Sequence, residues 1–217
     1  MSATNRGAVR EDQDAYVTPD WCIKRLFERY RPPCRPQGAI WLDPFAANGR
    51  LISVVRSMMP ERHMSAIELR PECAPELEKV CGPEGYWICD FLEAAKGMTA
   101  KSVDVITTNH PYSLTNESIA ACTSLAHISI MLMRINAIRG DGRHTLMKEL
   151  NPGLLVLPDR PSFTGWGMDA TEYAWFVFGD PALAGRWDML DETSKEEKAA
   201  WNAYARTVYP KPEKETV

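Results

Sequence analysis

The chain has 217 residues, of which 45% are hydrophobic and 25% charged, as is ordinary for a globular domain. That length supports one good core, or one core with a small appendage. The net charge is −4 and the pI about 5.6. No global field therefore draws the protein to nucleic acid, and a polyanionic partner would have to be held by a local basic patch.

The sequence disfavours membrane, metal and disulfide classes of protein. The longest apolar run, Ile128 to Met133, is far shorter than the about 20 residues that span a bilayer. The polar first residues have no apolar signal core. The six cysteines form no C-x-x-C pair and no set with histidine at metal-ligand spacing. We therefore expect a cytoplasmic protein with reduced thiols, no membrane partner and no metal site.

A first helix is predicted after residues 1–13, which we expect to form a disordered arm. The apolar residues of this helix recur at helical spacing: Trp21, Ile23, Leu26, Phe27 and Tyr30. Thr18 followed by Pro19 is typical of an N-cap and a first helical residue. The proline-rich stretch 31–38 ends the helix.

A strand, a turn of small residues and a helix follow. The run 39–42 is apolar, Asp43 ends it, and the turn 44–49 leads into a helix over about 50–59. This pattern is typical of the first crossover of an open α/β sheet, where ligands bind at the loops that leave the carboxyl ends of strands. A strand that ends in an ordinary Asp-Pro turn is an equally good interpretation of this stretch alone.

Two further predicted strands carry acidic residues at their ends. The strand 64–68 ends in Glu68, a spacing from Asp43 that suits an acid holding ribose hydroxyls in a dinucleotide-type fold. A surface glutamate at a strand end is the alternative. A third strand, 86–91, ends in Asp90 and Phe91.

The second half of the chain begins with a strand over 103–108, which runs directly into Asn109-His110-Pro111-Tyr112. The remaining predicted elements are a helix at 115–126, a strand at 127–133, a loop over 134–148, a hairpin of strands at 154–157 and 173–178, and a helix at 192–204. We expect Trp166, Trp175 and Phe176 to pack in the sheet.

The alternation of strand and helix predicts one α/β domain over residues 14–209, followed by a charged tail at 210–217. Its sheet would be Rossmann-like, seven-stranded and mostly parallel, with helices on both faces.

Five segments in this order resemble the class I S-adenosylmethionine-dependent methyltransferases, and most of all their DNA adenine-N6 branch. The segments are Thr18-Pro19, Asp43 to Gly49, Glu68, Asp90-Phe91 and Asn109 to Tyr112. That family has a Thr-Pro segment, a D-P-x-x-G-x-G cofactor loop, an acid after the second strand and an Asn-Pro-Pro-Tyr type tetrapeptide. The resemblance covers roughly residues 14–133.

The resemblance implies S-adenosyl-L-methionine as cofactor, with Thr18 near its methionine part, Glu68 on the ribose hydroxyls, and Asp90 with Phe91 facing its adenine. The implied cofactor-binding residues are Tyr16, Thr18, Pro19, Asp43, Pro44, Phe45, Ala46, Asn48, Gly49, Glu68, Leu69, Asp90, Phe91 and Asn109. An acceptor for vicinal hydroxyls and an apolar ring against a purine are what a nucleoside requires.

The same resemblance implies that Asn109, His110, Pro111 and Tyr112 act on the substrate amine. The side-chain oxygen of Asn109 and the backbone carbonyl of residue 110 would hold both amine hydrogens and favour a tetrahedral nitrogen, while Tyr112 would stack on the base. Catalysis would rest on positioning and electrostatics, and a base in a duplex would have to be flipped out.

The chain departs from the family pattern at two positions. Ala47 stands where the loop usually has glycine, and its Cβ is tolerable only if φ is negative. His110 replaces the first of two prolines, so the turn loses a fixed φ. Three alternatives to DNA adenine methylation therefore stay open: RNA adenine methylation, protein glutamine methylation, and a binding module that has lost turnover.

The substrate partner is expected to be nucleic acid, with DNA ahead of RNA. Residues expected to touch phosphates are Arg139, Arg143, Lys148 and Arg160, although a solvated loop explains the first three equally well. No room remains for an inserted recognition domain between Gly49 and Asn109, so sequence specificity would come from short loops, from a partner subunit, or not at all.

Overall fold

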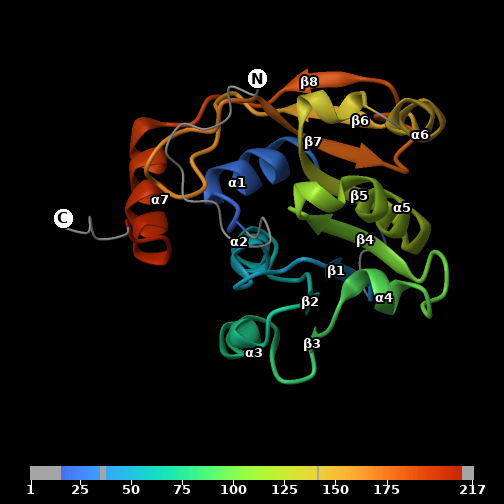
Figure 1. The fold of residues 1–217 in the computed structure, drawn as a ribbon, viewed down its shortest axis with the longest axis horizontal. Helices are drawn as coiled ribbons and strands as arrows, with labels where there is room; N and C mark the ends of the chain where they lie inside the picture. The colour runs from blue at the N-terminus through green and yellow to red at the C-terminus, as the bar shows by residue number, and fades with distance from the viewer. Residues whose placement is uncertain (1–15, 35–37, 141, 212–217) are drawn as a thin grey trace, which may run out of the picture.

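The computed structural model describes residues 16–34, 38–140 and 142–211. In this described part the chain forms one eight-stranded sheet of order β3-β2-β1-β4-β5-β7-β6-β8 (Figure 1). The strands are β1 (Trp41–Asp43), β2 (Met64–Glu68), β3 (Tyr86–Ile88), β4 (Val103–Thr108), β5 (Ala126–Arg134), β6 (Gly153–Val156), β7 (Tyr173–Phe178) and β8 (Trp187–Met189). Every strand is parallel to its neighbours except β7, which runs antiparallel to both β5 and β6.

Helices cover both faces of the sheet, because side chains alternate in direction along each strand. Trp41 packs with the helices of one face and its neighbour Leu42 with those of the other. The first face carries α1 (Asp20–Arg29), α2 (Arg50–Met58), α3 (Ala74–Cys81) and α7 (Lys195–Val208); the second carries α4 (Phe91–Ala95), α5 (Thr115–Leu125) and α6 (Arg143–Leu150). Three short 3-10 turns are η1 (Pro71–Cys73), η2 (Tyr112–Leu114) and η3 (Ile135–Ile138).

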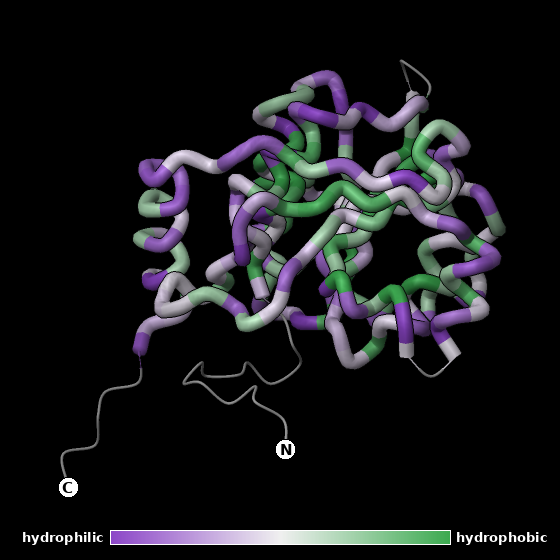
Figure 2. The backbone as a smooth tube through the Cα atoms, turned by 90° about the horizontal axis from the view of Figure 1, so that it is seen from above, coloured by the Kyte–Doolittle hydropathy of each residue, from purple (hydrophilic) through white to green (hydrophobic). Residues whose placement is uncertain are grey.

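The core lies on both sides of the central strands. All six residues of β7 are buried, which explains why its sequence is continuously apolar and does not alternate. In Figure 2 hydrophobic stretches run through the middle of the molecule, and hydrophilic residues dominate the outer helices. The predicted α/β class, the mostly parallel sheet and the antiparallel pairing of β6 with β7 are confirmed.

The predicted number of strands was wrong by one. Strand β8 adds to the free edge of β6, in parallel register. It is only three residues long and its two outer residues, Trp187 and Met189, are exposed. Because it lacks both an apolar run and a buried face, the hydrophobic pattern gave no signal for it.

Three local predictions also need correction. The second half of the loop expected over 134–148 is α6, which packs through the buried Met147. Strand β3 ends at Ile88, and Asp90 is the N-cap of α4. Helix α1 begins at Asp20 with Pro19 at the N-cap, one residue later than the N-cap pattern at Thr18 indicated.

Residues 1–13 and 212–217, the predicted arm and most of the predicted tail, lie outside the described residues. Among the described helices, none is long and apolar enough to cross a membrane. Strands β2, β1 and β4 are neighbours and parallel, so their last residues, Glu68, Asp43 and Thr108, end at one edge of the sheet. In open α/β sheets that edge is where ligands bind.

Candidate active site

Asp43 ends β1 as a buried carboxyl group. It accepts hydrogen bonds from Thr108 Oγ1 at 2.7 Å and from the amide of Phe45 at 3.2 Å. Burial raises its pKa to about 7; the two hydrogen bonds lower the pKa and the nearby charge of Glu68 raises it. The bond to Thr108 ties the end of β1 to the end of β4, directly before Asn109.

The cofactor loop, residues 44–49, is held mainly through its main chain. The amide of Ala46 donates to the carbonyl of Ile67 at 3.0 Å, and that of Ala47 donates to Glu68 Oε2 at 2.7 Å. Ala47 has φ +49°, in the left-handed region. The negative φ that we expected for an alanine at this position is therefore not found. The left-handed conformation costs Ala47 about 1–2 kcal/mol that glycine would not lose. The charged acceptor of Glu68 offsets that strain.

Gly49 completes the loop and begins α2. Its φ is +76°, and a Cβ there would lie 3.2 Å from the Leu77 side chain on α3. Both facts require a residue without a side chain at this close helix–helix approach. The glycine of the motif is thus explained by backbone and packing, independently of any ligand.

Glu68 ends β2 buried, with both carboxylate oxygens engaged. Oε2 accepts from the amide of Ala47, and Oε1 accepts from the amide and the Nε of Arg70, at 3.1 and 2.8 Å. A carboxylate oxygen has two lone pairs, so Oε2 can accept one more hydrogen bond. The next residue, Leu69, is 53% exposed, which is unusual for a leucine at the end of a buried strand.

Asp90 and Phe91 differ from each other in accessibility. Asp90 is exposed, and its side chain accepts from the amides of Leu92 and Glu93 at the start of α4. Phe91 is buried in the core, with its ring edge-on to Phe45 at a centroid distance of 5.3 Å. The implied contact of the Phe91 ring with a cofactor adenine stays a prediction, and the ring lies in the core.

The target turn, residues 109–112, follows β4. Asn109 Nδ2 donates to the carbonyl of Tyr16 at 3.2 Å, and Asn109 Oδ1 accepts from the Tyr112 hydroxyl at 2.9 Å. The amide is therefore fixed in orientation by partners on both atoms. Because a carbonyl oxygen has two lone pairs, Oδ1 can accept one more hydrogen bond.

His110 braces this turn from inside the protein. It is buried, with Nε2 3.2 Å from Thr115 Oγ1, and Thr115 donates its hydroxyl hydrogen to the carbonyl of Tyr112 at 2.7 Å. The Thr115 oxygen can then only accept from the ring, so Nε2 carries the proton of a neutral imidazole. Burial, reinforced by the charge of Arg143, lowers the pKa of His110 to about 3. Hydrogen bonds thus replace the fixed φ of the missing proline.

Residues far along the chain surround Tyr112. Its ring lies 5.7 Å from that of Tyr173 on β7, and the Arg134 guanidinium lies over it at 4.9 Å. Arg134 also donates to the Tyr173 hydroxyl at 3.1 Å, and that hydroxyl donates to Asp169 at 2.6 Å. Sequence reasoning did not assign Tyr173 or Asp169 to the site, because they belong to β7 and to the connection that precedes it.

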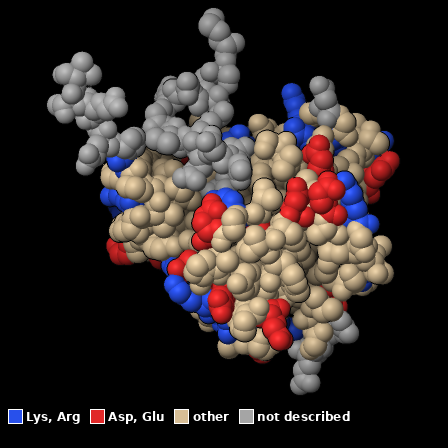
Figure 3. All heavy atoms as spheres, turned by 60° about the horizontal axis from the view of Figure 1, so that its bottom comes forward, with Lys and Arg blue, Asp and Glu red and all other residues tan. Residues whose placement is uncertain are grey.

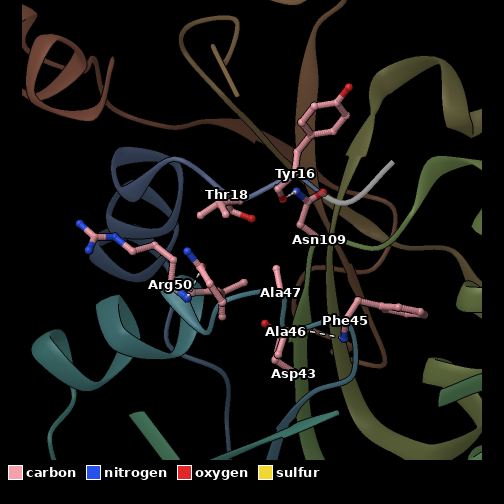
Figure 4. A pocket seen from close by; sticks show the side chains of 11 residues that line it. Tyr16, Thr18, Asp43, Phe45, Ala46, Ala47, Arg50 and Asn109 are labelled. Atoms are coloured by element: carbon pink, nitrogen blue, oxygen red, sulfur yellow. Dashed lines mark hydrogen bonds between the residues drawn. The ribbon is translucent and has the colours of Figure 1, made fainter. Parts of the chain in front are cut away.

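A small hollow of about 10 Å³ lies between the end of β1 with its loop and the turn after β4 (Figure 4). Asp43 and the cofactor loop form its floor, Thr18 and Arg50 lie on one side, and Tyr16 with Asn109 lies on another. The lining residues are Tyr16, Val17, Thr18, Asp43, Phe45, Ala46, Ala47, Asn48, Arg50, Leu51 and Asn109.

Helix α7 supports this hollow from the end of the chain, which the sequence did not reveal. The Tyr204 hydroxyl accepts from Asn48 Nδ2 at 3.1 Å, and the Tyr204 ring lies under the Arg50 guanidinium at 4.4 Å. Arg50 is also paired with Asp20 through two hydrogen bonds, of 2.7 and 2.5 Å. The only sign in the sequence that this helix end has a charged or aromatic partner was its basic first residue, Arg50.

The four basic residues expected at phosphates differ in their surroundings. Arg160 is paired with Glu172, and the charge of Arg143 acts on the buried His110. Arg139, at the end of η3, and Lys148, on α6, are both exposed to solvent. On the face drawn in Figure 3, basic and acidic side chains are interspersed, with no continuous basic area.

The sequence matches no family model and no curated protein, so the likeness to known proteins is one of structure. A type I restriction-modification methyltransferase subunit from Streptococcus thermophilus superposes with a TM-score of 0.64 and 11% identity over 91% of this chain. This chain spans 54% of that subunit's length.

Two further structures agree. A putative class I S-adenosylmethionine-dependent methyltransferase from Listeria monocytogenes has a TM-score of 0.55, 11% identity, and covers 88% of this chain and 68% of its own. The 23S rRNA methyltransferase ErmE has a TM-score of 0.54, 14% identity, and covers 88% and 77%. These structures and this chain share one fold.

Proposed function

We propose that this protein is an S-adenosylmethionine-dependent methyltransferase that acts on an exocyclic amine, most specifically N6 of adenine in DNA. One observation carries the proposal: Asp43 and Asn109, from neighbouring strand ends, line the same hollow. A methyl donor held at the first and a planar amine held at the second would then be adjacent.

The donor half of the site, formed by Asp43, the cofactor loop and Glu68, fits a cationic nucleoside. With a pKa of about 7, the Asp43 carboxyl group ionises readily when a positive charge approaches. The main chain of the cofactor loop allows close approach of a ligand. Glu68 Oε2 retains one lone pair for a ribose hydroxyl, and the exposed Leu69 offers an apolar face to a purine. At about 10 Å³ the hollow is far smaller than the about 300 Å³ at the lower end of ligand pockets, so the cofactor would lie mostly outside it, along the strand ends toward Asp90.

The acceptor half fits a weakly nucleophilic NH2 group. The remaining lone pair of Asn109 Oδ1 and the backbone carbonyl of His110 would accept the two amine hydrogens. When bound, the cofactor supplies a methyl group on a sulfonium; the amine nitrogen forms the new bond as the carbon–sulfur bond breaks, and a proton leaves to solvent. The neutral His110, with its pKa of about 3, positions the turn and does not take the proton.

DNA is favoured over RNA and protein by the structural comparison. The subunit from Streptococcus thermophilus has the highest TM-score reported above and belongs to a restriction-modification system. We further propose that sequence specificity, if any, comes from short loops or from a partner subunit.

The test is incubation of the protein with methyl-labelled S-adenosylmethionine and, separately, DNA, RNA and protein, followed by mass spectrometry of the labelled product. We expect N6-methyladenine in DNA. Label in RNA adenine or in protein glutamine would show that the proposed substrate is wrong and that the proposed type of reaction is right. Cofactor binding by calorimetry with no label in any substrate would contradict the proposal and identify a binding module.

A further inference from the structure

Trp166 lies outside the sheet, on the connection between β6 and β7. The prediction that it packs in the sheet was wrong: Trp175 and Phe176 are buried in β7, whereas Trp166 is 44% exposed. Met168, two residues later, is 72% exposed. Two large apolar side chains at the tip of one connection, each open to solvent, mark a contact surface.

The Trp166 loop, residues 164–169, is nonetheless held firmly against α7 (Figure 1). Arg206 Nε donates to the carbonyl of Gly165 at 2.9 Å, and Trp166 Nε1 donates to the carbonyl of Tyr209 at 2.8 Å. Gly165 has φ +77°, and a Cβ there would lie 2.5 Å from the carbonyl oxygen of Asn202. The glycine lets the loop close on α7, so the exposed ring is presented from a fixed support.

The loop is adjacent to the target turn. Phe163, immediately before it, lies 5.9 Å from the ring of Tyr16 and 5.4 Å from that of Tyr173. Tyr16 is the residue whose carbonyl holds Asn109, and Tyr173 contacts Tyr112. The β6–β7 connection also leaves β6 at the edge of the sheet where β4 ends, since β6 is parallel to β5 and β4.

The charge around Trp166 is positive, in contrast with the chain as a whole. The Arg206 guanidinium lies 4.8 Å and Lys211 Nζ 4.5 Å from the centre of its ring. Within the described residues neither has an ion pair, whereas the three acids of the connection are all paired: Asp159 with Lys198, Asp169 with Arg134 and Glu172 with Arg160. The acids therefore do not cancel the two cations.

We infer that the Trp166 loop is the contact for the DNA strand beside the target base. A neighbouring base would stack on Trp166 in place of Lys211, whose ammonium would then face a phosphate, while Arg206 stays bonded to the carbonyl of Gly165. An exposed aromatic ring flanked by cations is how proteins hold unpaired nucleotides, and a flipped target leaves such nucleotides beside it. The inference rests on the proposed function, and supplies the short loop that an acidic chain needs to hold a polyanion.

The test is the dissociation constant of a fluorescein-labelled DNA duplex, measured by anisotropy with the full chain. Trp166→Ala should raise it about tenfold, the typical loss when a stacking ring is removed. Trp166→Phe, which keeps a ring but loses the hydrogen bond to Tyr209, should stay within about threefold of wild type. The matched control is Trp187→Ala, an equally large change at an exposed tryptophan on β8, which should have no effect.

A second experiment measures how Lys211 contributes to the salt dependence of DNA binding. Lys211→Gln should reduce the slope of log affinity against log salt by about 1, and Lys79→Gln on α3 should leave it unchanged. Equal affinity of Trp166→Ala and Trp187→Ala would overturn the inference, as would a loss as large in Trp166→Phe as in Trp166→Ala, which would indicate a structural hydrogen bond only. Wild-type protein that methylates no DNA would refute the proposed function; methylation of DNA with no effect of Trp166→Ala would refute this inference alone.

Discussion

The cofactor loop and the target turn follow neighbouring strands, yet they are held in different ways. The loop is fixed through its main chain, by amides that donate to the carboxylates of Asp43 and Glu68. The turn is fixed through side chains: Asn109, Tyr112 and Thr115 are linked by hydroxyl and amide hydrogen bonds, with Tyr173 packed against them.

The difference also separates the two proposed roles experimentally. Changes in the target turn should affect transfer while cofactor affinity stays, and changes around the cofactor loop should affect cofactor affinity or stability. The following variants test that division, from the largest expected effect to the smallest.

Asn109→Ala should lower methyl transfer about 100-fold or more, the usual effect of removing one group that stabilises developing charge. Cofactor affinity should change little, because the side chain is expected to hold the amine. Single-turnover transfer and calorimetry measure the two quantities, and Asn116→Ala, an exposed asparagine on α5, is the control. Loss of cofactor binding in Asn109→Ala would mean that Asn109 belongs to the donor half.

Asp43→Asn should weaken cofactor binding and remove a pH dependence of stability. The folded-state pKa of about 7 lies above the value of about 3.9 expected when the chain is unfolded. Stability from this group is therefore complete below about pH 4 and is lost as the pH rises to about 7, by up to about 1.4 kcal/mol per unit. The melting temperatures of wild type and Asp43→Asn should converge as the pH falls through this range. A difference that stays constant with pH would contradict the raised pKa of Asp43.

Thr115→Val should lower transfer about tenfold at unchanged cofactor affinity. It removes the hydroxyl that links His110 to the carbonyl of Tyr112 and leaves the buried ring nitrogen without a partner, at a cost of about 1–3 kcal/mol in stability. Thr123→Val, later on the same helix, loses only hydrogen bonds to the carbonyls of Ile119 and Ala120 and should retain transfer. Equal transfer by both variants would show that the bracing by His110 is dispensable.

Ala47→Gly should raise stability by up to about 1 kcal/mol, since φ +49° is strained only for a residue with a Cβ. Ala46→Gly, one residue earlier, has no such strain to release and should destabilise by a similar amount. Chemical denaturation measures both. The same sign for both variants would mean that the left-handed conformation of Ala47 carries no penalty.

The sequence allowed the mostly parallel sheet and the succession of its first five strands along the chain to be predicted. Those features depend on local periodicity, as in the strands 64–68 and 103–108, whose bounds were predicted correctly. Strand β8 and helix α6 were missed because neither has a strong apolar pattern.

The partners of the site residues were not predictable for a different reason. Tyr204 beside Asn48, Tyr173 beside Tyr112 and the turn-bracing role of His110 depend on contacts between segments far apart in the chain. A single sequence contains the residues but not their pairing. The exposure of Trp166 was missed for the same reason, since an aromatic residue in a loop has the same local signal whether buried or open.

The most direct test of the shared site is a crystal structure with S-adenosylhomocysteine, the product of the proposed reaction. We predict that its sulfur lies in the hollow between Asp43 and Asn109, with its ribose hydroxyls toward Glu68. Binding with the sulfur outside this hollow, or with the adenine ring seated in the target turn, would contradict the account.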